Sequence, residues 1–231
     1  MMRIRVLCKQ RRTCIQAGGL FGEWPIELAK LFDTVQTFEP EPNNYEILLA
    51  NVEGINNISA YPYALGMVRG RVDMCRSNDE DRNPGAWYTQ FGNEIKQVAI
   101  DNFSVDDVDL IYLDIEGGET DALLGAVETI KRCRPVIGLE DKKNEFWRRY
   151  GYTRSPVDML VRDFNYVQVS HFNHDKILIP RRERVMADSD NRGWYGRPFW
   201  EDLRFPAQAI NQPGSDSELK KYRKYPPGVS W

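Results

Sequence analysis

The chain has 231 residues, of which 42% are hydrophobic, and this is enough to fill the core of one α/β domain with an extension. Its formal net charge of −3 gives no general attraction to nucleic acid or to an anionic membrane, because both favour clustered positive charge. No stretch reaches the ~18 apolar residues needed to cross a bilayer, and residues 1–7 are too short and too charged for a signal peptide. We therefore expect a soluble cytoplasmic protein without a membrane span.

The four cysteines, at positions 8, 14, 75 and 133, form no C-x-x-C pair. Both histidines, His171 and His174, lie far from them along the chain, so no cysteine and histidine set has the spacing of a zinc site. We expect reduced thiols, as is usual in the cytoplasm.

Short apolar runs alternate with helix-period segments from the start of the chain, which is typical of a parallel sheet covered by helices. The pattern predicts strands at Thr13–Ala17, Thr34–Phe38 and Ile58–Ala64, and helices at Ile26–Phe32 and Tyr45–Val52. Pro25 lies at the start of the first helix, where its missing N–H costs nothing. We expect Pro42-Asn43-Asn44 to cap the second helix.

Residues 69–97 are polar and have Asn83-Pro84-Gly85 near their centre. This composition fits either a long excursion over the surface or a hairpin that carries Trp87, Tyr88 and Phe91. The sequence leaves both alternatives open.

The second half of the domain continues the alternation of strands and helices. An apolar face through Leu123, Leu124, Val127 and Ile130 predicts one further helix. The other predicted elements are strands at Asp109–Leu113, Pro135–Leu139, Tyr166–Ser170 and Lys176–Ile179 and a helix from Pro156, capped by Ser155, to about Phe164. The whole pattern predicts a doubly wound, mostly parallel α/β sheet of seven strands over residues 1–180.

Residues 181–231 lack this alternation and form a predicted aromatic-rich C-terminal extension. Four large rings at 194–200 would leave an exposed apolar patch if the segment did not pack on the domain. We expect either a lid that contributes acceptor contacts or a segment that packs on the flank for stability.

A glycine-rich turn, Gly18-Gly19-Leu20-Phe21-Gly22, follows the first strand at the sheet edge where α/β proteins bind ligands. Glu39 ends the second strand, where a carboxylate accepts hydrogen bonds from both hydroxyls of a ribose. The glycines follow G-G-x-x-G and not the GxGxxG spacing of dinucleotide sites. A nucleoside ligand without a pyrophosphate therefore fits this turn better.

Asp114 and Glu116 follow the strand Asp109–Leu113, and in extended chain their carboxylates would face the same crevice. The alternative interpretation is a helix start, because acidic side chains such as Glu119 and Asp121 favour a helix N-terminus. We retain Asp114 and Glu116 as candidate catalytic residues.

Five segments occur in one order along the chain: Ile15–Gly22, Phe38-Glu39-Pro40, Ala64-Leu65-Gly66, Leu113–Glu119 and Arg134–Ile137. In this combination the sequence resembles the FkbM family of S-adenosylmethionine (SAM) dependent methyltransferases over residues 13–180. The resemblance implies the Rossmann-like class I methyltransferase fold, SAM as the cofactor and methyl transfer, usually to a hydroxyl oxygen.

By position, the resemblance implies that Gly18 and Gly22 shape the turn under the methionine part of SAM and that Glu39 holds the ribose. Asp114 would lie beside the transferring methyl group. The predicted cofactor-binding residues are Gln16, Gly18, Gly19, Gly22, Glu39, Pro40, Ala64, Leu65 and Asp114. Gln16 and Tyr112 depart from the Asp and the Lys that are usual in the family at these positions.

These residues predict O-methylation of a sugar, a glycan or another small molecule, with Asp114 or Glu116 as the base and a histidine in reserve. We expect no required metal, although Asp114, Glu140 and Asp141 form an alternative set of oxygen ligands for Mg²⁺. Two other functions stay open. The first is a nucleic-acid methyltransferase, because Lys220–Tyr225 interleaves basic and aromatic residues, although we regard nucleic acid as the less favoured partner. The second is a non-catalytic nucleoside-binding scaffold.

Overall fold

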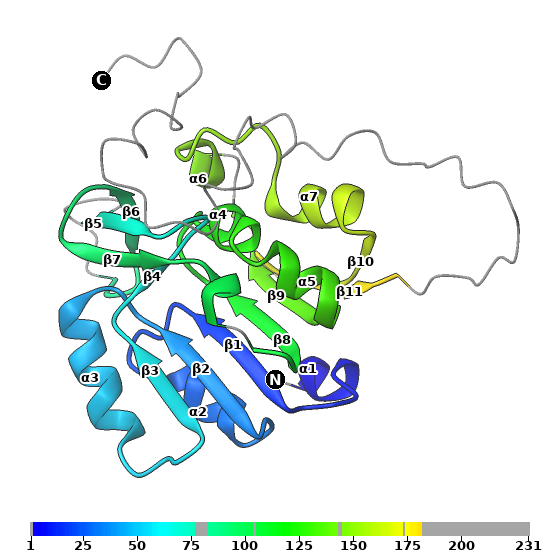
Figure 1. The fold of residues 1–231 in the computed structure, drawn as a ribbon, viewed down its shortest axis with the longest axis horizontal. Helices are drawn as coiled ribbons and strands as arrows, with labels where there is room; N and C mark the ends of the chain where they lie inside the picture. The colour runs from blue at the N-terminus through cyan, green and yellow to red at the C-terminus, as the bar shows by residue number, and fades with distance from the viewer. Residues whose placement is uncertain (1, 77–82, 104, 143–144, 173, 182–231) are drawn as a thin grey trace, which may run out of the picture.

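The computed structural model describes residues 2–76, 83–103, 105–142, 145–172 and 174–181. Its main sheet has seven strands in the order β10-β11-β9-β8-β1-β2-β3. The strands are β1 (Thr13–Ala17), β2 (Thr34–Phe38), β3 (Ile58–Tyr61), β8 (Val108–Leu113), β9 (Val136–Glu140), β10 (Tyr166–Phe172) and β11 (Asp175–Pro180). All seven predicted strands are therefore present (Figure 1).

Strands β1, β2, β3, β8 and β9 pair in parallel, while β11 runs antiparallel to both of its neighbours. From β1 the chain proceeds outward through β2 and β3, and then returns to place β8 on the other side of β1. The carboxyl ends of β1 and β8 thus form the switch point at which such sheets bind ligands. The prediction of a doubly wound, mostly parallel sheet is confirmed.

Helices cover both faces of the main sheet (Figure 1). Alternate residues of β8 show the division: Ile111 packs in the cluster that contains Leu123 of α4 and Leu160 of α7. Leu110 packs on the opposite face, with Leu28 of α2. The helices are α1 (Met2–Leu7), α2 (Glu23–Ala29), α3 (Pro42–Val52), α4 (Glu119–Leu124), α5 (Val127–Cys133), α6 (Glu145–Arg148) and α7 (Pro156–Asp163), with the 3₁₀ helix η1 at Ile100–Phe103.

The polar segment 69–97 forms a hairpin within a second, four-stranded sheet, which decides between the two alternatives left open by the sequence. Its strands are β4 (Ala64–Leu65), β5 (Gly70–Arg76), β6 (Trp87–Phe91) and β7 (Ile95–Val98), in the order β4-β7-β5-β6. The predicted strand Ile58–Ala64 is therefore divided between two sheets. Pro62 lies at the division, and proline cannot donate to a strand ladder.

Three details of the predicted helices are wrong. The helix predicted at Ile26–Phe32 is observed at Glu23–Ala29, three residues earlier at both ends. The helix expected through Leu123 and Ile130 is two helices, α4 and α5. The second of them, α5, has its own start, where the Asp101 carboxylate accepts hydrogen bonds from Glu128 N and Thr129 N. The cap of α3 is Glu41, which accepts a hydrogen bond of 2.7 Å from Asn44 N. The sequence analysis also did not predict α1 or β7.

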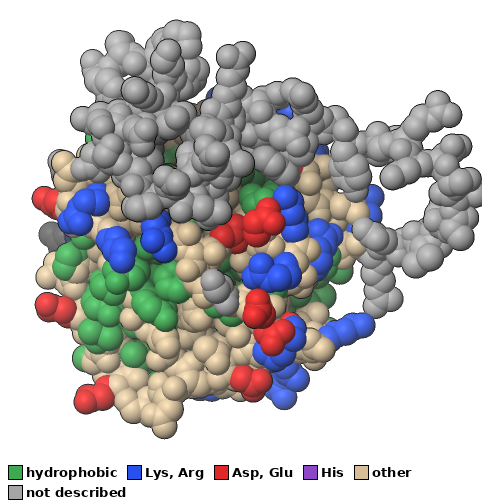
Figure 2. Space-filling model, in the orientation of Figure 1, with side chains coloured by type: hydrophobic (Ala, Val, Ile, Leu, Met, Phe, Trp, Pro, Cys, Tyr) green, Lys and Arg blue, Asp and Glu red, His purple; other side chains and the backbone are tan. Residues whose placement is uncertain are grey.

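The cap of α7 is the predicted Ser155, whose Oγ accepts a hydrogen bond from Asp158 N at 3.1 Å. Within the described ranges no helix is long and apolar enough to cross a bilayer. Figure 2 shows acidic and basic side chains interleaved on the visible face, in agreement with the mixed charge of the sequence. The extension at 182–231 and its basic segment 220–225 lie outside the described residues, so the domain boundary and the lid remain predictions.

Candidate active site

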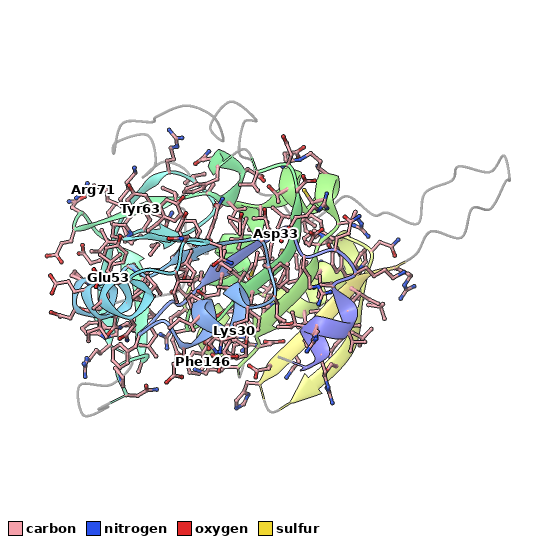
Figure 3. All side chains as sticks on the ribbon, turned by 90° about the horizontal axis from the view of Figure 1, so that it is seen from below. Lys30, Asp33, Glu53, Tyr63, Arg71 and Phe146 are labelled. Carbon is pink, nitrogen blue, oxygen red and sulfur yellow. The ribbon has the colours of Figure 1, made fainter. Side chains whose placement is uncertain are left out.

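A cavity of about 260 Å³ lies at the carboxyl ends of the central strands of the main sheet, and the second sheet forms its other wall. Figure 3 shows the labelled Tyr63, which lines this cavity, near Arg71 at the side of the molecule that the second sheet occupies. The strand ends contribute chiefly Gly18, Leu20, Glu39, Pro40, Asp114, Glu116, Glu140 and the adjacent Lys142, and the second sheet contributes Ala64, Leu65, Met74, Trp87 and Thr89.

The glycine turn joins β1 to α2 and lies directly against the end of β8. Gly18 has a φ of 82°, and a Cβ on it would lie 1.9 Å from the carbonyl oxygen of Asp114, so no other residue fits without a shift of the backbone. Leu20 has a φ of 45°, in the left-handed region that a branched side chain rarely adopts. Gly18 N and Gly19 N donate to Phe38 O at 3.0 and 3.1 Å and thereby hold the turn against β2.

Glu39, at the end of β2, is buried, with 5% of its surface exposed, and is therefore not a solvated loop carboxylate. Its Oε2 accepts a hydrogen bond of 2.7 Å from Leu20 N, and its Oε1 accepts one of 3.0 Å from Glu41 N. Burial raises the pKa of Glu39, although these two N–H groups favour its charged form. The carboxylate thus connects the glycine turn to the start of α3.

Gln16 lies in β1 and is fully buried. Its Nε2 donates to Ala17 O at 3.0 Å and to Gly18 O at 2.9 Å, and its Oε1 accepts a hydrogen bond from the Thr37 hydroxyl. Gln16 therefore supports the turn from beneath and does not line the cavity.

The turn after β8 is held by Glu119, which is buried at the start of α4. Its Oε1 accepts hydrogen bonds from Ile115 N at 3.0 Å and Gly117 N at 3.4 Å. Glu116 and Gly117 have φ values of 53° and 101°, and a Cβ on Gly117 would lie 2.7 Å from Phe146 O. This left-handed pair carries the chain around so that Asp114 and Glu116 both line the cavity.

Asp114, Glu116 and Glu140 bring carboxylate oxygens to within 4.8 Å of one another. Lys142, two residues after β9, places its Nζ 2.7 Å from Glu116 Oε1 and 2.9 Å from Glu140 Oε2. One ammonium group therefore pairs with two of the three carboxylates, and Asp114 has no such ion pair within the described residues.

Burial and crowding of like charges alter the acidity of this cluster. Burial, followed by repulsion from Glu140, raises the pKa of Asp114 to about 8. Burial raises the pKa of Glu119 to about 7, although the N–H groups of Ile115 and Gly117 act in the opposite direction. A carboxylate whose pKa lies near neutrality is a stronger base than an exposed aspartate, which suits general-base catalysis.

The second sheet presents Met74, Trp87 and Thr89 to the same cavity as the carboxylates. Tyr150, which follows α6, fixes this wall: its hydroxyl accepts a hydrogen bond from Thr89 N and lies 3.2 Å from Thr89 Oγ1. The Arg149 guanidinium stacks 4.0 Å above the centre of the Tyr88 ring. The hairpin is therefore attached to the segment that follows α6, and of the residues in these contacts Thr89 lines the cavity.

The sequence matches the family model described as the methyltransferase FkbM domain over residues 28–178, which is more than half of the chain. The chain belongs to the FkbM methyltransferase family. The resemblance recognised in the sequence is thereby confirmed. No protein of curated function matches the sequence.

Several solved methyltransferases are similar to this FkbM-family chain at low identity. An FkbM methyltransferase from Methylobacillus flagellatus KT is 20% identical with a TM-score of 0.48, and the similarity covers 73% of this chain but only 43% of that one. An O-methyltransferase from Bacillus cereus, solved with S-adenosylhomocysteine (SAH), is 14% identical with a TM-score of 0.44 over 77% of this chain and 76% of its own. The N-methyltransferase NodS from Bradyrhizobium japonicum WM9, also solved with SAH, is 11% identical with a TM-score of 0.47 over 77% and 81% of the two chains.

Most residues predicted for the site of the FkbM-family chain surround one cavity. Gly18, Glu39, Pro40, Ala64, Leu65, Asp114 and Glu116 all line it. Gly19 lies behind the turn, where a Cβ would meet Leu48 and Thr37 at 2.9 Å, and Gly22 is the residue before α2, with a φ of 97°. Gln16, Gly19 and Gly22 thus contribute to the shape of the turn and not to the surface of the cavity.

The other candidate residues lie apart from the cavity. Asp141 is outside the carboxylate cluster, in which Glu116 joins Asp114 and Glu140 in its place. Burial raises the pKa of Asp141, and the neighbouring Ser155 acts in the opposite direction. His174 is exposed in the turn between β10 and β11, and of His171 the structure describes only the backbone, which pairs with Lys176.

The sequence analysis missed Lys142, Met74, Thr89 and Tyr63 as cavity residues and mentioned Trp87 only as part of a hairpin. The single available signal was the run Glu140-Asp141-Lys142, in which a basic residue directly follows an acidic strand end. The residues of the second sheet had no such signal, because their place depends on how two sheets pack.

Proposed function

We propose that this FkbM-family chain transfers the methyl group of SAM to a hydroxyl oxygen of a sugar, a glycan or another small molecule. The observation that supports this proposal is that one cavity is lined by Gly18 of the glycine turn, Glu39, Asp114 and Trp87 of the second sheet. We propose that cofactor and acceptor bind together in this cavity and meet at the Asp114 carboxylate.

The residues at one end of the cavity fit a nucleoside. Each oxygen of Glu39 accepts one backbone hydrogen bond, and the Asn44 side chain is a further donor to this carboxylate. A carboxylate has about four acceptor positions, so Glu39 retains capacity for a ribose hydroxyl. Ala64 and Leu65 are buried and apolar and, with the Tyr63 ring, provide a surface for a flat base such as adenine. When bound there, SAM supplies a methyl group on a positively charged sulfur.

The chain's own contribution to the reaction is placement and proton transfer. We propose that Asp114 accepts the proton of the acceptor hydroxyl while the oxygen forms its bond to the methyl carbon and the carbon–sulfur bond breaks, with the electron pair remaining on sulfur. Much of the acceleration comes from holding the acceptor in line with that bond. Because the pKa of Asp114 is about 8, its ionised form is a strong proton acceptor for this step, and that form predominates above about pH 8.

Glu116 is the alternative base, and its environment makes it the weaker candidate. Burial raises the pKa of Glu116, but its carboxylate pairs with Lys142 Nζ at 2.7 Å, and this ion pair acts in the opposite direction. We expect Glu116→Gln to reduce turnover by less than about tenfold, against the 10²–10⁴-fold expected on loss of a general base. Measurement of kcat for both variants decides between the two carboxylates.

The charge of the acceptor end favours an uncharged acceptor. Three carboxylates and one ammonium group border this part of the cavity, so an anionic acceptor would be repelled. Trp87 adds a flat ring and Thr89 a hydroxyl group, which together suit a polyhydroxylated ring or chain.

The four free cysteines are consistent with the cytoplasmic location that we expect.

The direct test is a transfer assay with SAM that carries a labelled methyl group. Sugars, glycans, small alcohols and RNA would be offered separately, and mass spectrometry would locate the methyl group in the product, with Asp114→Asn as the inactive control. We expect label on a hydroxyl oxygen of an uncharged acceptor. Label on RNA would favour the nucleic-acid alternative, and SAM binding without transfer to any class would favour a scaffold.

A further inference from the structure

Lys142 connects the ends of two neighbouring strands at the reacting end of the cavity. Its Nζ lies 2.7 Å from Glu116 Oε1, in the turn after β8, and 2.9 Å from Glu140 Oε2, the last residue of β9. It also lies 5.2 Å from the centre of the Phe146 ring. Its side chain is 23% exposed, and the two glutamate side chains are 10% and 14% exposed, so these charges are partly removed from water.

The carboxylates around Lys142 have the arrangement of a divalent-cation site. Three oxygens, one each from Asp114, Glu116 and Glu140, lie within 4.8 Å of one another, and such oxygens are the ligands that Mg²⁺ and Ca²⁺ prefer. Three carboxylates this close repel one another strongly unless a cation lies between them or one of them holds a proton. Lys142 supplies that cation from the chain itself: its Nζ donates a hydrogen bond to Glu116 Oε1 and lies 2.9 Å from Glu140 Oε2, close enough for an ion pair.

We propose that Lys142 is a built-in counter-cation that occupies the place of a divalent metal ion and makes the site independent of metal. By pairing with Glu116 and Glu140, it leaves Asp114 as the carboxylate available to the reacting groups. Lys142 is therefore a positioning residue for the proposed methyl transfer, and only the rate part of this proposal rests on that function.

The test compares metal binding by the wild-type protein, Lys142→Met and Lys142→Arg. Terbium luminescence, excited through Trp87 in the same cavity, is the readout, and it requires no methyl transfer. We expect Lys142→Met to bind terbium at least about tenfold more tightly than the wild type, since one charged hydrogen-bonding group is replaced by a metal that meets the same oxygens. The gain should disappear in Lys142→Met/Asp114→Asn, and Lys142→Arg should not show it.

Equal terbium affinity of the wild-type protein and Lys142→Met would overturn the proposal. Loss of wild-type terbium binding in Asp114→Asn would overturn it too, because the native cluster would then hold a metal beside Lys142. If Lys142→Met does not fold, Lys142→Met/Glu140→Gln provides the second test, since it removes one charge of each sign. We expect this double variant to fold, and a double variant as unstable as the single one would show that packing and not charge is the role of Lys142.

Transfer activity gives an independent readout. With an acceptor identified, Lys142→Met should lose about tenfold or more in kcat. Mg²⁺ should restore part of this activity and K⁺ none of it. The wild-type enzyme should be unaffected by EDTA. A wild-type enzyme inhibited by EDTA and restored by Mg²⁺ contradicts the counter-cation role. If no acceptor is methylated at all, the proposed function fails, and the terbium result still decides the role of Lys142.

Discussion

The two ends of the cavity are built in different ways. At the glycine-turn end, Glu39 and Leu20 are 19 residues apart in the chain and meet through consecutive β-α units. At the other end, Tyr150 bonds Thr89 across 61 residues, and the hairpin reaches the cavity only because a second sheet packs beside the first. The glycine turn depends on local geometry and the hairpin on long-range packing, although the two ends of the cavity also touch, since Asn44 Nδ2 donates to Pro84 O at 3.0 Å. This difference agrees with the proposed division between a constant cofactor and a variable acceptor.

The largest effect should come from the residue at which the two ends meet. We expect Asp114→Asn to lower kcat by about 10²–10⁴-fold, because the amide cannot accept the proton of the acceptor hydroxyl. SAM affinity, measured by calorimetry, should change far less. Near-normal turnover in Asp114→Asn would remove Asp114 from the chemistry and return Glu116 to consideration.

The cofactor end is tested by Glu39→Ala. Loss of the carboxylate removes the proposed ribose contact, and a hydrogen bond to a charged group contributes about 1.5–3 kcal/mol, so SAM should bind roughly 10–150-fold more weakly. Because Glu39 also accepts the N–H groups of Leu20 and Glu41, Glu39→Gln is the milder control, which keeps one acceptor oxygen. A folded Glu39→Ala protein with the full SAM-induced thermal shift would contradict the ribose assignment.

The acceptor end is tested by Trp87→Ala. Removal of this ring should raise the KM for the acceptor by about tenfold, the effect of losing one aromatic contact of 1–2 kcal/mol, and leave SAM affinity unchanged. Phe91, on the same strand but 43% exposed and not part of the cavity, is the matched control position, and Phe91→Ala should change neither constant. If Trp87→Ala weakened SAM binding instead, the division of the cavity into two ends would be wrong.

The smallest effect concerns the stability of the protein without ligand. The pKa values of Asp114 and Glu119, about 8 and about 7, lie above the usual values of 3.8 and 4.5, so the folded state retains protons that the unfolded chain has released. Their contribution to stability is complete below about pH 4 and is lost as the pH rises through 7–8. We expect the Tm to fall by a few degrees between pH 6 and pH 9, and to fall less in Asp114→Asn. Equal slopes for the two proteins would show that Asp114 is not protonated in the folded state.

Much of the fold was predictable because it follows from local patterns. Buried runs such as Thr13–Ala17 gave strands with the predicted bounds, and Ser155 with Pro156 marked the start of a helix. The exceptions have non-local causes. The division of the third strand depends on the pairing of β4 with β7, and α5 begins where it does because Asp101, from a distant segment, caps it.

The candidate site shows the same difference. Gly18, Glu39 and Asp114 each end a strand next to the switch point, so their approach follows from the order of the strands. Lys142 and Thr89 are held in the site by long-range contacts, among them those with Glu116 and Tyr150. No periodicity in the sequence marks such contacts, which is why these residues were not predicted.

A crystal structure of the chain with SAH tests the central claim most directly. The account predicts the ribose hydroxyls within hydrogen-bond distance of the Glu39 carboxylate, the base beside Ala64 and Leu65, and the sulfur atom at the Asp114 side of the cavity facing Trp87. SAH bound elsewhere, or bound in the cavity with its sulfur directed away from Asp114, would contradict it.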